Sequence, residues 1–412
     1  MSKQVLLRWI DEDRDKLIDF LGRFVRAPSP NPPGDTRAAT SVIAGFLEEQ
    51  GLDYEVIEPL ANAPNVVASF AGGRPGRHLV FNGHIDVYPC DDADRWTHPP
   101  WSGEIAEGKL FGRGSSDMKN GTASLLFVYA YLHRLRDELA GRLTFTAVSD
   151  EETGGKWGAE YLVDQRPVQG DCLLNAEPGA PTTIRFGEKG ALRLRFTVRT
   201  SGCHGAYTHK SKSATKIAAA LIGDLEAIAD LPVPMTSNIA TSLSEAADEI
   251  DRIHVKGAAK VIREYTVNIG VVRGGIKTNM LPGLCTLDVD IRVPVGATND
   301  AARTKAMEIL ERYPEVTVET INESEPSWSD PDHEMVRCLR NSCEAVSGAA
   351  PFTITSLGAT DARKWRAKGI PSFTYGTTAT NVAMADEHTV IEEWLNVVRV
   401  HALAAYDYLR AG

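Results

Sequence analysis

The chain has 412 residues, of which 43% are hydrophobic and 24% charged, and 44 Lys and Arg against 55 Asp and Glu give a formal net charge of −11. This composition excludes a fibrous or disordered protein and is typical of a soluble globular chain of two or three domains. The acidic balance argues against a nucleic-acid partner, because phosphate-binding proteins usually carry a basic stripe.

The sequence shows no feature of export or of membrane insertion. Residues 1–16 are charged almost throughout and lack the apolar run of a secretory signal. The longest apolar stretch, residues 122–132, is about half of the ~20 residues that a membrane span needs. The six cysteines are scattered without a CxxC pair, which is typical of reduced thiols. We therefore expect a cytoplasmic protein with no membrane partner.

Helical and strand patterns alternate in the first part of the chain. Apolar residues at helical spacing predict helices around residues 17–25 and 42–47 and over 118–136. Short β-rich runs predict strands at 54–58, 65–70, 78–82, 142–149 and 172–175. This alternation predicts an α/β fold with a mixed, mainly parallel sheet between helices on both faces.

The middle of the chain has a different pattern. Apolar and polar residues alternate strictly over 192–199, as in a strand with one face in water. A helix (214–229), two strands (266–272, 285–293), a helix (301–312) and a strand (316–321) follow, which is the ferredoxin-like β-α-β-β-α-β order. We predict an inserted domain at 188–324 between two parts of one domain, 1–187 and 325–412, and extra helical structure at 242–262.

Acidic and imidazole side chains follow several predicted strands of the first part. They are His84 and Asp86, then Asp117 after a glycine-rich turn, then the run Asp150-Glu151-Glu152, and then Glu177. Taken alone, each of these clusters is more often a solvent-exposed turn, or a surface side chain with its own hydrogen-bond partners, than a metal site. Together they would crowd carboxylates at the sheet edge where α/β proteins bind ligands, and that crowding is costly without a cation. The residue types indicate zinc, cobalt or manganese in an oxygen-rich site.

These motifs, in this order, resemble the two-metal deacylase and exopeptidase family that includes acetylornithine deacetylase, succinyl-diaminopimelate desuccinylase, aminoacylase and carboxypeptidase G. The matching segments are GHIDVYP, GRGSSDMKNG, SDEETGG, AEP and a late DEHT, and the resemblance covers nearly the whole chain. It implies a zinc-exopeptidase-like catalytic domain with an inserted dimerisation or lid domain. It also implies a cis peptide bond after Asp117.

The resemblance implies a role for each residue of the centre. His84 and Glu177 would hold one divalent metal ion, Glu152 and His388 a second, and Asp117 would bridge them, with Zn²⁺ expected and Co²⁺ or Mn²⁺ as alternatives. Asp86 would orient His84. Glu151 would be the general base. It would take a proton from the water molecule shared by the two metals and so produce the hydroxide that attacks the substrate. Neighbours on an extended segment point opposite ways, so Glu152 could bind metal while Glu151 faces the water.

The inserted domain carries further matches. Residues 203–209 resemble a segment whose first histidine, here His204, reaches across a dimer interface to stabilise an oxyanion. The resemblance therefore implies a homodimer through 188–324. Asn279 and Arg292 would hold a substrate carboxylate, although a strand-end salt bridge explains Arg292 about equally well. Gly358 and Thr360 belong to a turn that would line the substrate pocket.

The sequence leaves the substrate open. Within the resemblance, a glutamate at position 177 favours hydrolysis of an N-acyl amino acid, with a dipeptidase or carboxypeptidase as the alternative. A carbamoyl or aromatic-amine hydrolase on the same two metals is a further alternative. A non-catalytic scaffold would have lost a ligand or the base, but all six residues are present. A phosphoesterase would need a basic clamp near the acids, which the sequence lacks.

Overall fold

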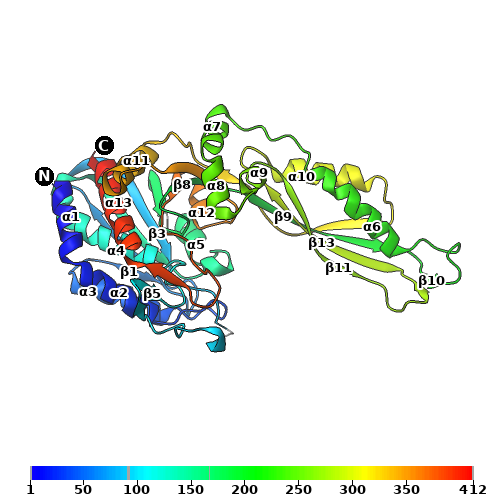
Figure 1. The fold of residues 1–412 in the computed structure, drawn as a ribbon, viewed down its shortest axis with the longest axis horizontal. Helices are drawn as coiled ribbons and strands as arrows, with labels where there is room; N and C mark the ends of the chain where they lie inside the picture. The colour runs from blue at the N-terminus through cyan, green and yellow to red at the C-terminus, as the bar shows by residue number, and fades with distance from the viewer. Residues whose placement is uncertain (1, 91–92, 167, 411–412) are drawn as a thin grey trace. The chain divides into compact units, whose positions relative to one another are not determined.

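The computed structural model of the chain describes residues 2–90, 93–166 and 168–410, and these form two compact units (Figure 1). The first unit comprises Met1–Phe186, Ser329–Ile354 and Thr360–Gly412. The second comprises Gly187–Trp328 and Thr355–Ala359. The chain thus leaves the first unit, builds most of the second and then returns.

A nine-stranded sheet of described residues forms the centre of the first unit, with strand order β1-β2-β6-β3-β7-β17-β8-β15 and β16 paired to β8. The strands β6, β3, β7 and β17 in its middle are parallel, and the flanking pairs are antiparallel. The strands are β1 (Glu55–Ile57), β2 (Asn65–Ala71), β3 (Arg74–His84), β6 (Ala140–Val148), β7 (Cys172–Asn175), β8 (Thr183–Glu188), β15 (Ser327–Trp328), β16 (Phe352–Ser356) and β17 (Ser372–Thr374). The mixed sheet predicted from the sequence is confirmed.

Helices cover both faces of this sheet. Alternate residues of a strand face opposite ways, and Val80 packs against α5 and α12 through Ala159 and Trp365. Gly83 faces the other way, toward α4, where an added Cβ would lie 2.3 Å from the Thr122 hydroxyl oxygen. Only glycine therefore lets α4 approach the end of β3 so closely.

The helices of the first unit include two that are buried over most of their length, α4 and α13. The α-helices are α1 (Ser2–Glu12), α2 (Arg14–Val25), α3 (Arg37–Glu49), α4 (Lys119–Arg134), α5 (Ala159–Gln165), α11 (Glu334–Ser347), α12 (Ala362–Arg366) and α13 (Ile391–Arg410). Short 3₁₀ turns are η1 (Ala93–Arg95), η2 (Arg136–Glu138) and η3 (Glu151–Thr153). A small sheet joins β18 (His388–Val390), β5 (Lys109–Phe111) and β4 (Ile105–Ala106).

The second unit is an antiparallel sheet of order β11-β13-β9-β14 with helices packed on it. Its elements are β9 (Gly190–Arg199), β10 (Cys203–His204), α6 (Ala214–Leu225), η4 (Glu226–Ile228), β11 (Thr266–Gly274), β12 (Met280–Leu281), β13 (Leu284–Val293), α10 (Asn299–Leu310) and β14 (Val316–Ser324). Leu192, Leu194, Phe196 and Val198 are buried with the helices, as the alternation predicts. The ferredoxin-like strand order is confirmed.

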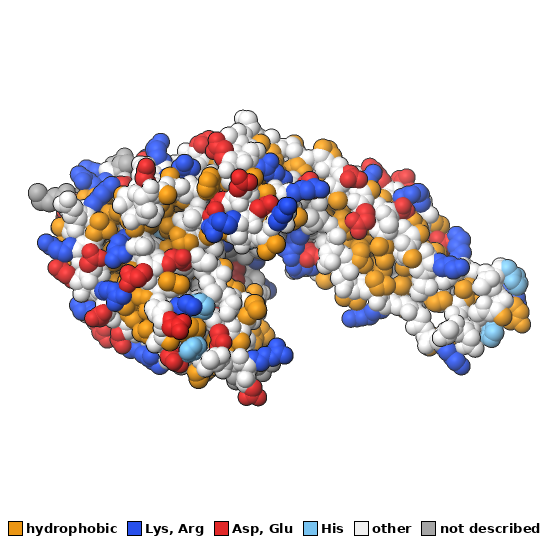
Figure 2. Space-filling model, in the orientation of Figure 1, with side chains coloured by type: hydrophobic (Ala, Val, Ile, Leu, Met, Phe, Trp, Pro, Cys, Tyr) orange, Lys and Arg blue, Asp and Glu red, His pale blue; other side chains and the backbone are white. Residues whose placement is uncertain are grey.

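The extra helical segment of the second unit begins earlier than the sequence suggests. It consists of α7 (Ser237–Glu245), α8 (Ala247–His254) and α9 (Ala258–Val261). Among the described residues, no helix combines the length and apolar character that crossing a membrane requires. On the face shown in Figure 2, acidic and basic side chains are interspersed.

Candidate metal centre

His84 ends β3 at the carboxyl edge of the parallel strands and is 1% exposed. Its Nδ1 lies 2.8 Å from the carbonyl oxygen of Asp86. A carbonyl only accepts, so Nδ1 carries the proton of the neutral ring and Nε2 keeps its lone pair. Nε2 lies 3.1 Å from Asp117 Oδ1 and 3.4 Å from Glu177 Oε1. A lone pair that faces two carboxylates needs a proton or a metal ion between them.

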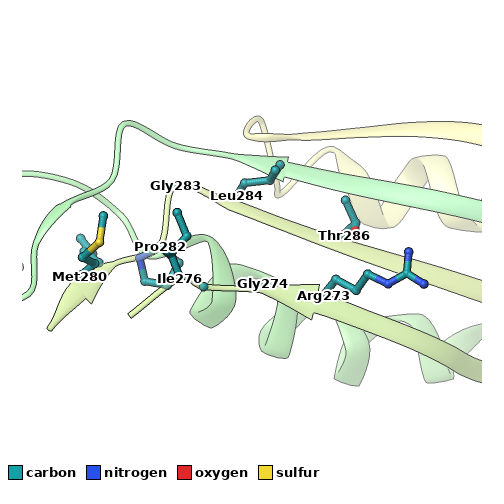
Figure 3. A pocket seen from close by; sticks show the side chains of 10 residues that line it. Arg273, Gly274, Ile276, Met280, Pro282, Gly283, Leu284 and Thr286 are labelled. Atoms are coloured by element: carbon teal, nitrogen blue, oxygen red, sulfur yellow. The ribbon is translucent and has the colours of Figure 1, made fainter. Parts of the chain in front are cut away.

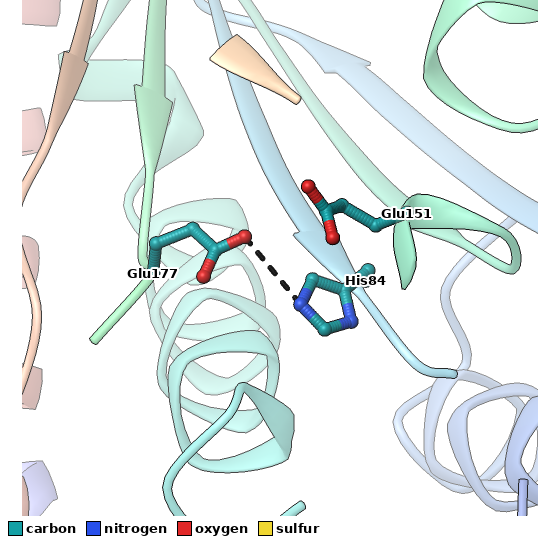
Figure 4. Close-up of side chains that lie close together, drawn as sticks. All are labelled: His84, Glu151 and Glu177. Atoms are coloured by element: carbon teal, nitrogen blue, oxygen red, sulfur yellow. Dashed lines mark ion pairs between the residues drawn. The ribbon is translucent and has the colours of Figure 1, made fainter. Parts of the chain in front are cut away.

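Two groups of candidate ligands share this imidazole. His84, Glu151 and Glu177 form one group and His84, Asp117 and Glu152 the other, with one ligand atom per residue within 4.8 Å of the others. Figure 4 shows Glu151 and Glu177 approaching His84 from different elements, η3 and the segment after β7. The structure thus gathers the expected base and four of the five expected metal ligands.

The expectation of an extended segment at Glu151 and Glu152 is wrong. These residues begin the 3₁₀ turn η3, in which successive side chains are about 120° apart around the axis. The Asp86 carboxylate accepts the N–H groups of Glu151 (3.2 Å) and Glu152 (3.1 Å) and so holds this turn. The two side chains still diverge, and each joins a different group of ligands.

The acids of the centre repel one another strongly. Burial, with further repulsion from Asp117, raises the pKa of Glu152 to about 9. Burial and the charge of Glu177 raise the pKa of Glu151 well above its usual value. Burial opposes protonation of His84, but the charge of Glu177 and a hydrogen bond to Asp117 outweigh it and raise the pKa of His84. Such groups hold protons unless a cation replaces them.

The residues present fit a divalent cation. Oε1 of Glu152 is buried and has no hydrogen-bond partner among the described residues. An unpartnered buried carboxylate oxygen is costly, and a metal ion in this oxygen-rich set would satisfy it. His84, Asp117, Glu152 and Glu177 are the side chains that could hold such an ion. His388, the other expected ligand, lies outside both groups.

The loop that carries Asp117 is held by Glu387, which the sequence analysis did not single out. Glu387 is fully buried, and its Oε1 accepts the N–H groups of Gly114, Ser116 and Asp117 at 3.0–3.1 Å. Its other oxygen pairs with Arg113. Its position directly before the candidate ligand His388 is the one feature of the sequence that could have pointed to Glu387. The Asp117–Met118 peptide bond is cis, as the resemblance implies.

A second buried acid, Asp361, also escaped the sequence analysis. It is 2% exposed, and Asn82 Nδ2 lies 3.4 Å from its Oδ2. Burial raises the pKa of Asp361 to about 7. Asp361 directly follows Thr360, which the sequence places in a turn, so its position could be read from the sequence although its burial could not.

The second unit holds all but one of the residues expected to bind substrate or stabilise the oxyanion. β10 pairs with β12, and the N–H of Gly205 donates to the carbonyl oxygen of Asn279 at 2.8 Å, so His204 and Asn279 lie close together. Arg292 lies near the opposite end of the sheet and pairs with Asp290 at 3.1 Å. Gly358 is exposed in the second unit, whereas Thr360 is buried in the first. Their roles remain predictions.

A mixed α/β sheet with acids and an imidazole gathered at the carboxyl edge of its parallel strands defines a candidate metal-dependent hydrolase. Comparison with known proteins gives the family: residues 80–407 match peptidase family M20/M25/M40, and the chain belongs to that family. It is a metal-dependent hydrolase of carbon–nitrogen amide bonds.

Individual relatives cover nearly the whole chain. A succinyl-diaminopimelate desuccinylase of Cereibacter sphaeroides (strain KD131 / KCTC 12085) is 29% identical over 400 residues, 93% of this chain and 97% of the relative. The fold is similar to that of an M20 family metallo-carboxypeptidase from Sulfolobus solfataricus, with a TM-score of 0.76, 17% identity, and coverage of 96% and 99%. It is also similar to a dinuclear metal-binding M20 peptidase from Bacillus subtilis, with a TM-score of 0.65, 15% identity, and coverage of 97% and 99%.

Proposed function

We propose that the chain is a two-metal deacylase that cleaves the amide bond of an N-acyl amino acid, with Glu151 as the general base. The observation that carries this proposal is the geometry around His84. Two neighbouring acids on η3 belong to different groups of ligand atoms around one imidazole. One of them can therefore serve a metal ion while the other stays available for proton transfer.

The proposed ligands are His84, Asp117, Glu152 and Glu177, with His388 added on the strength of the resemblance. We propose Zn²⁺ as the metal, because a site of carboxylates and imidazole without thiolate suits a catalytic zinc. When bound, two divalent cations polarise the scissile carbonyl and lower the pKa of a water molecule. Glu151 takes the proton of that water and gives it to the leaving amine.

We propose that substrate recognition rests mainly on residues of the second unit, with Thr360 of the first. Arg292 is half-buried, and both Nε and Nη2 contact Asp290 Oδ2, at 3.2 and 3.1 Å. We propose that its guanidinium also binds the carboxylate of the amino-acid part, for which a planar fork is suited. Asn279 would support it, His204 would stabilise the oxyanion, and Gly358 and Thr360 would line the pocket.

The same unit supports the proposal of a homodimer through 188–324. Arg292 pairs with Ala191 at the start of β9, whereas His204 follows the end of that strand. From Ala191 to the end of β9 the strand is about 25 Å long, and Arg292 and His204 are separated by about that length. Arg292 therefore cannot contact the same small substrate as His204 of its own chain, nor as Asn279, which lies beside His204. A second copy would have to supply both His204 and Asn279.

An apolar groove beside β12 is a surface that such a second copy would cover. The groove has a volume of about 380 Å³ and includes Ile276, Met280 and Leu284 (Figure 3). These side chains are 90%, 44% and 46% exposed. Exposed apolar side chains gathered at one place are typical of an interface.

The test is the release of free amine from N-succinyl, N-acetyl and N-carbamoyl amino acids and from dipeptides, by protein loaded with zinc. We expect an N-acyl amino acid to give the highest kcat/KM, and Arg292→Ala to raise KM for it. Highest turnover of a dipeptide would replace the deacylase proposal with an exopeptidase. No turnover of any member would contradict the proposed substrate class.

A further inference from the structure

The segment before α3 packs beside the chain that leaves His84. Ser29 Oγ donates to the carbonyl oxygen of Ile85 at 2.6 Å, and the N–H of Asn31 donates to that of Val87 at 2.9 Å. Asn31 is 6% exposed. A segment more than fifty residues away in sequence thus lies in fixed register against Asp86.

The carboxamide of Asn31 makes two hydrogen bonds that join parts of the centre. Its Nδ2 donates to Asp86 Oδ2 at 2.9 Å and to Thr153 Oγ1 at 3.0 Å. Thr153 is the last residue of η3, the turn that begins with Glu151. Both hydrogens of one amide group are therefore used to tie the turn to Asp86.

Asp86 depends on these donors. Its carboxylate is fully buried and accepts the N–H of Glu151 on Oδ1 and the N–H of Glu152 on Oδ2. Oδ2 thus receives hydrogen bonds from Glu152 and from Asn31. Without the amide, the carboxylate keeps fewer donors and gains freedom to rotate, and the turn loses its link through Thr153.

We propose that Asn31 is a positioning residue for amide hydrolysis, one that holds Glu151 at its working place by fixing Asp86 and Thr153. This inference rests on the proposed function, because it takes Glu151 as the base. Among the described residues, no hydrogen bond joins the Asn31 side chain to Glu151 or to a candidate ligand, and its effect passes through Asp86 and the turn.

The kinetic test uses Asn31→Ala and Asn31→Asp. Asn31→Ala should lower kcat by about 10–100-fold, as expected when a supporting hydrogen bond of a metal site is lost, with KM and zinc content little changed. Asn31→Asp would set a carboxylate 2.9 Å from that of Asp86. At pH 8 this variant should have a lower kcat than Asn31→Ala. At pH 6 part of its kcat should be recovered, because a protonated Asp can again donate a hydrogen bond.

The matched control is Asn299→Ala. Asn299 is a fully buried asparagine of the second unit whose Nδ2 donates to the Ser324 carbonyl oxygen at 3.2 Å. This variant should cost stability and leave kcat within about twofold, because the described hydrogen bonds of Asn299 go to Ser324 and Glu325 and not to a residue assigned to the reaction. A fall in kcat of the same size in both asparagine variants, with matched loss of thermal stability, would overturn the positioning role.

Hydrogen exchange decides the same question without turnover. In Asn31→Ala, the amides of a peptide over 150–154 should exchange about tenfold faster, because the Glu151 and Glu152 N–H groups lose their fixed acceptor. Unchanged exchange together with unchanged kcat would overturn the proposal. If the wild type hydrolyses no amide, the proposed function fails. Faster exchange would then still support the positioning of the turn by Asn31, and unchanged exchange would overturn that too.

Discussion

Glu151 and Glu152 are neighbours in sequence, yet their surroundings differ. Glu151 is grouped with Glu177, and Glu152 with Asp117, around the shared imidazole of His84. We expect Glu151→Gln to lower kcat by about 10²–10⁴-fold, the usual contribution of a general base, and to leave the zinc content unchanged. Metal analysis beside kinetics checks both points, with the exposed Glu49→Gln as control. A variant that keeps full kcat would remove Glu151 from the mechanism.

Glu387 illustrates a buried charge that supports the centre. It pairs with Arg113, which is 3% exposed, and binds three backbone N–H groups. We expect Glu387→Ala to lower the free energy of unfolding by about 3–5 kcal/mol, because Arg113 would stay buried without a counter-charge. Urea denaturation measures this loss.

The control is a glutamate–arginine pair at the surface, Glu392 with Arg14, whose side chains are 65% and 45% exposed. Glu392→Ala should cost less than about 1 kcal/mol. Equal losses in the two variants would show that burial of the Arg113 pair has no energetic effect.

At the level of single residues, the sequence predicted which side chains gather but not what holds them. The acids and His84 were found because they follow strands at one sheet edge. Asp361 and Glu387 were missed because their importance comes from burial by distant segments. Asn31 was missed for the same reason, since its partners lie 55 and 122 positions away.

Secondary structure was predictable where apolar residues recur at a regular spacing or form a continuous run. Strict alternation placed β9, and a continuous apolar run placed the buried helix α4. The turn η3 was not predictable, because its backbone is set by hydrogen bonds to Asp86 and not by local propensity. The early start of the helical segment at α7 was missed although Ile239 and Leu243, four residues apart, are buried on one face of the helix.

Helix α13 provides a test of pH dependence. His401 is fully buried, accepts from Ser124 Oγ at Nδ1 (2.7 Å) and donates from Nε2 to the Tyr375 carbonyl oxygen (2.9 Å). Burial lowers the pKa of His401 to about 4. The unfolded chain, with a pKa of about 6.5 at this residue, binds more protons between these values, so stability falls as pH drops from 6.5 to 4, by about 3 kcal/mol in total.

The variant His401→Gln should remove this dependence, because an amide keeps one donor and one acceptor but does not titrate. Urea denaturation at pH 7, 5.5 and 4.5 would compare the two chains. The wild type should lose more stability than the variant over this range. Parallel curves would mean that His401 does not titrate differently in the folded state.

At the scale of the whole molecule, the proposed dimer makes a prediction about mixing. His204→Ala and Glu151→Gln chains should each be nearly inactive alone. A mixed dimer would contain one site with an intact Glu151 and a His204 from the partner, so unfolding and refolding the two together should restore about a quarter of wild-type activity. A mixture that stays inactive, or a monomer in sedimentation, would contradict action of His204 across an interface.

The central claim is that acids around His84 hold metal ions that the chain needs for amide hydrolysis. The most direct measurement is amine release by chelator-stripped protein before and after zinc is added back, with the bound metal counted. We predict no turnover without metal, and full recovery as about two zinc ions bind per chain. Turnover that persists in stripped protein, or zinc binding that restores none, would contradict the account.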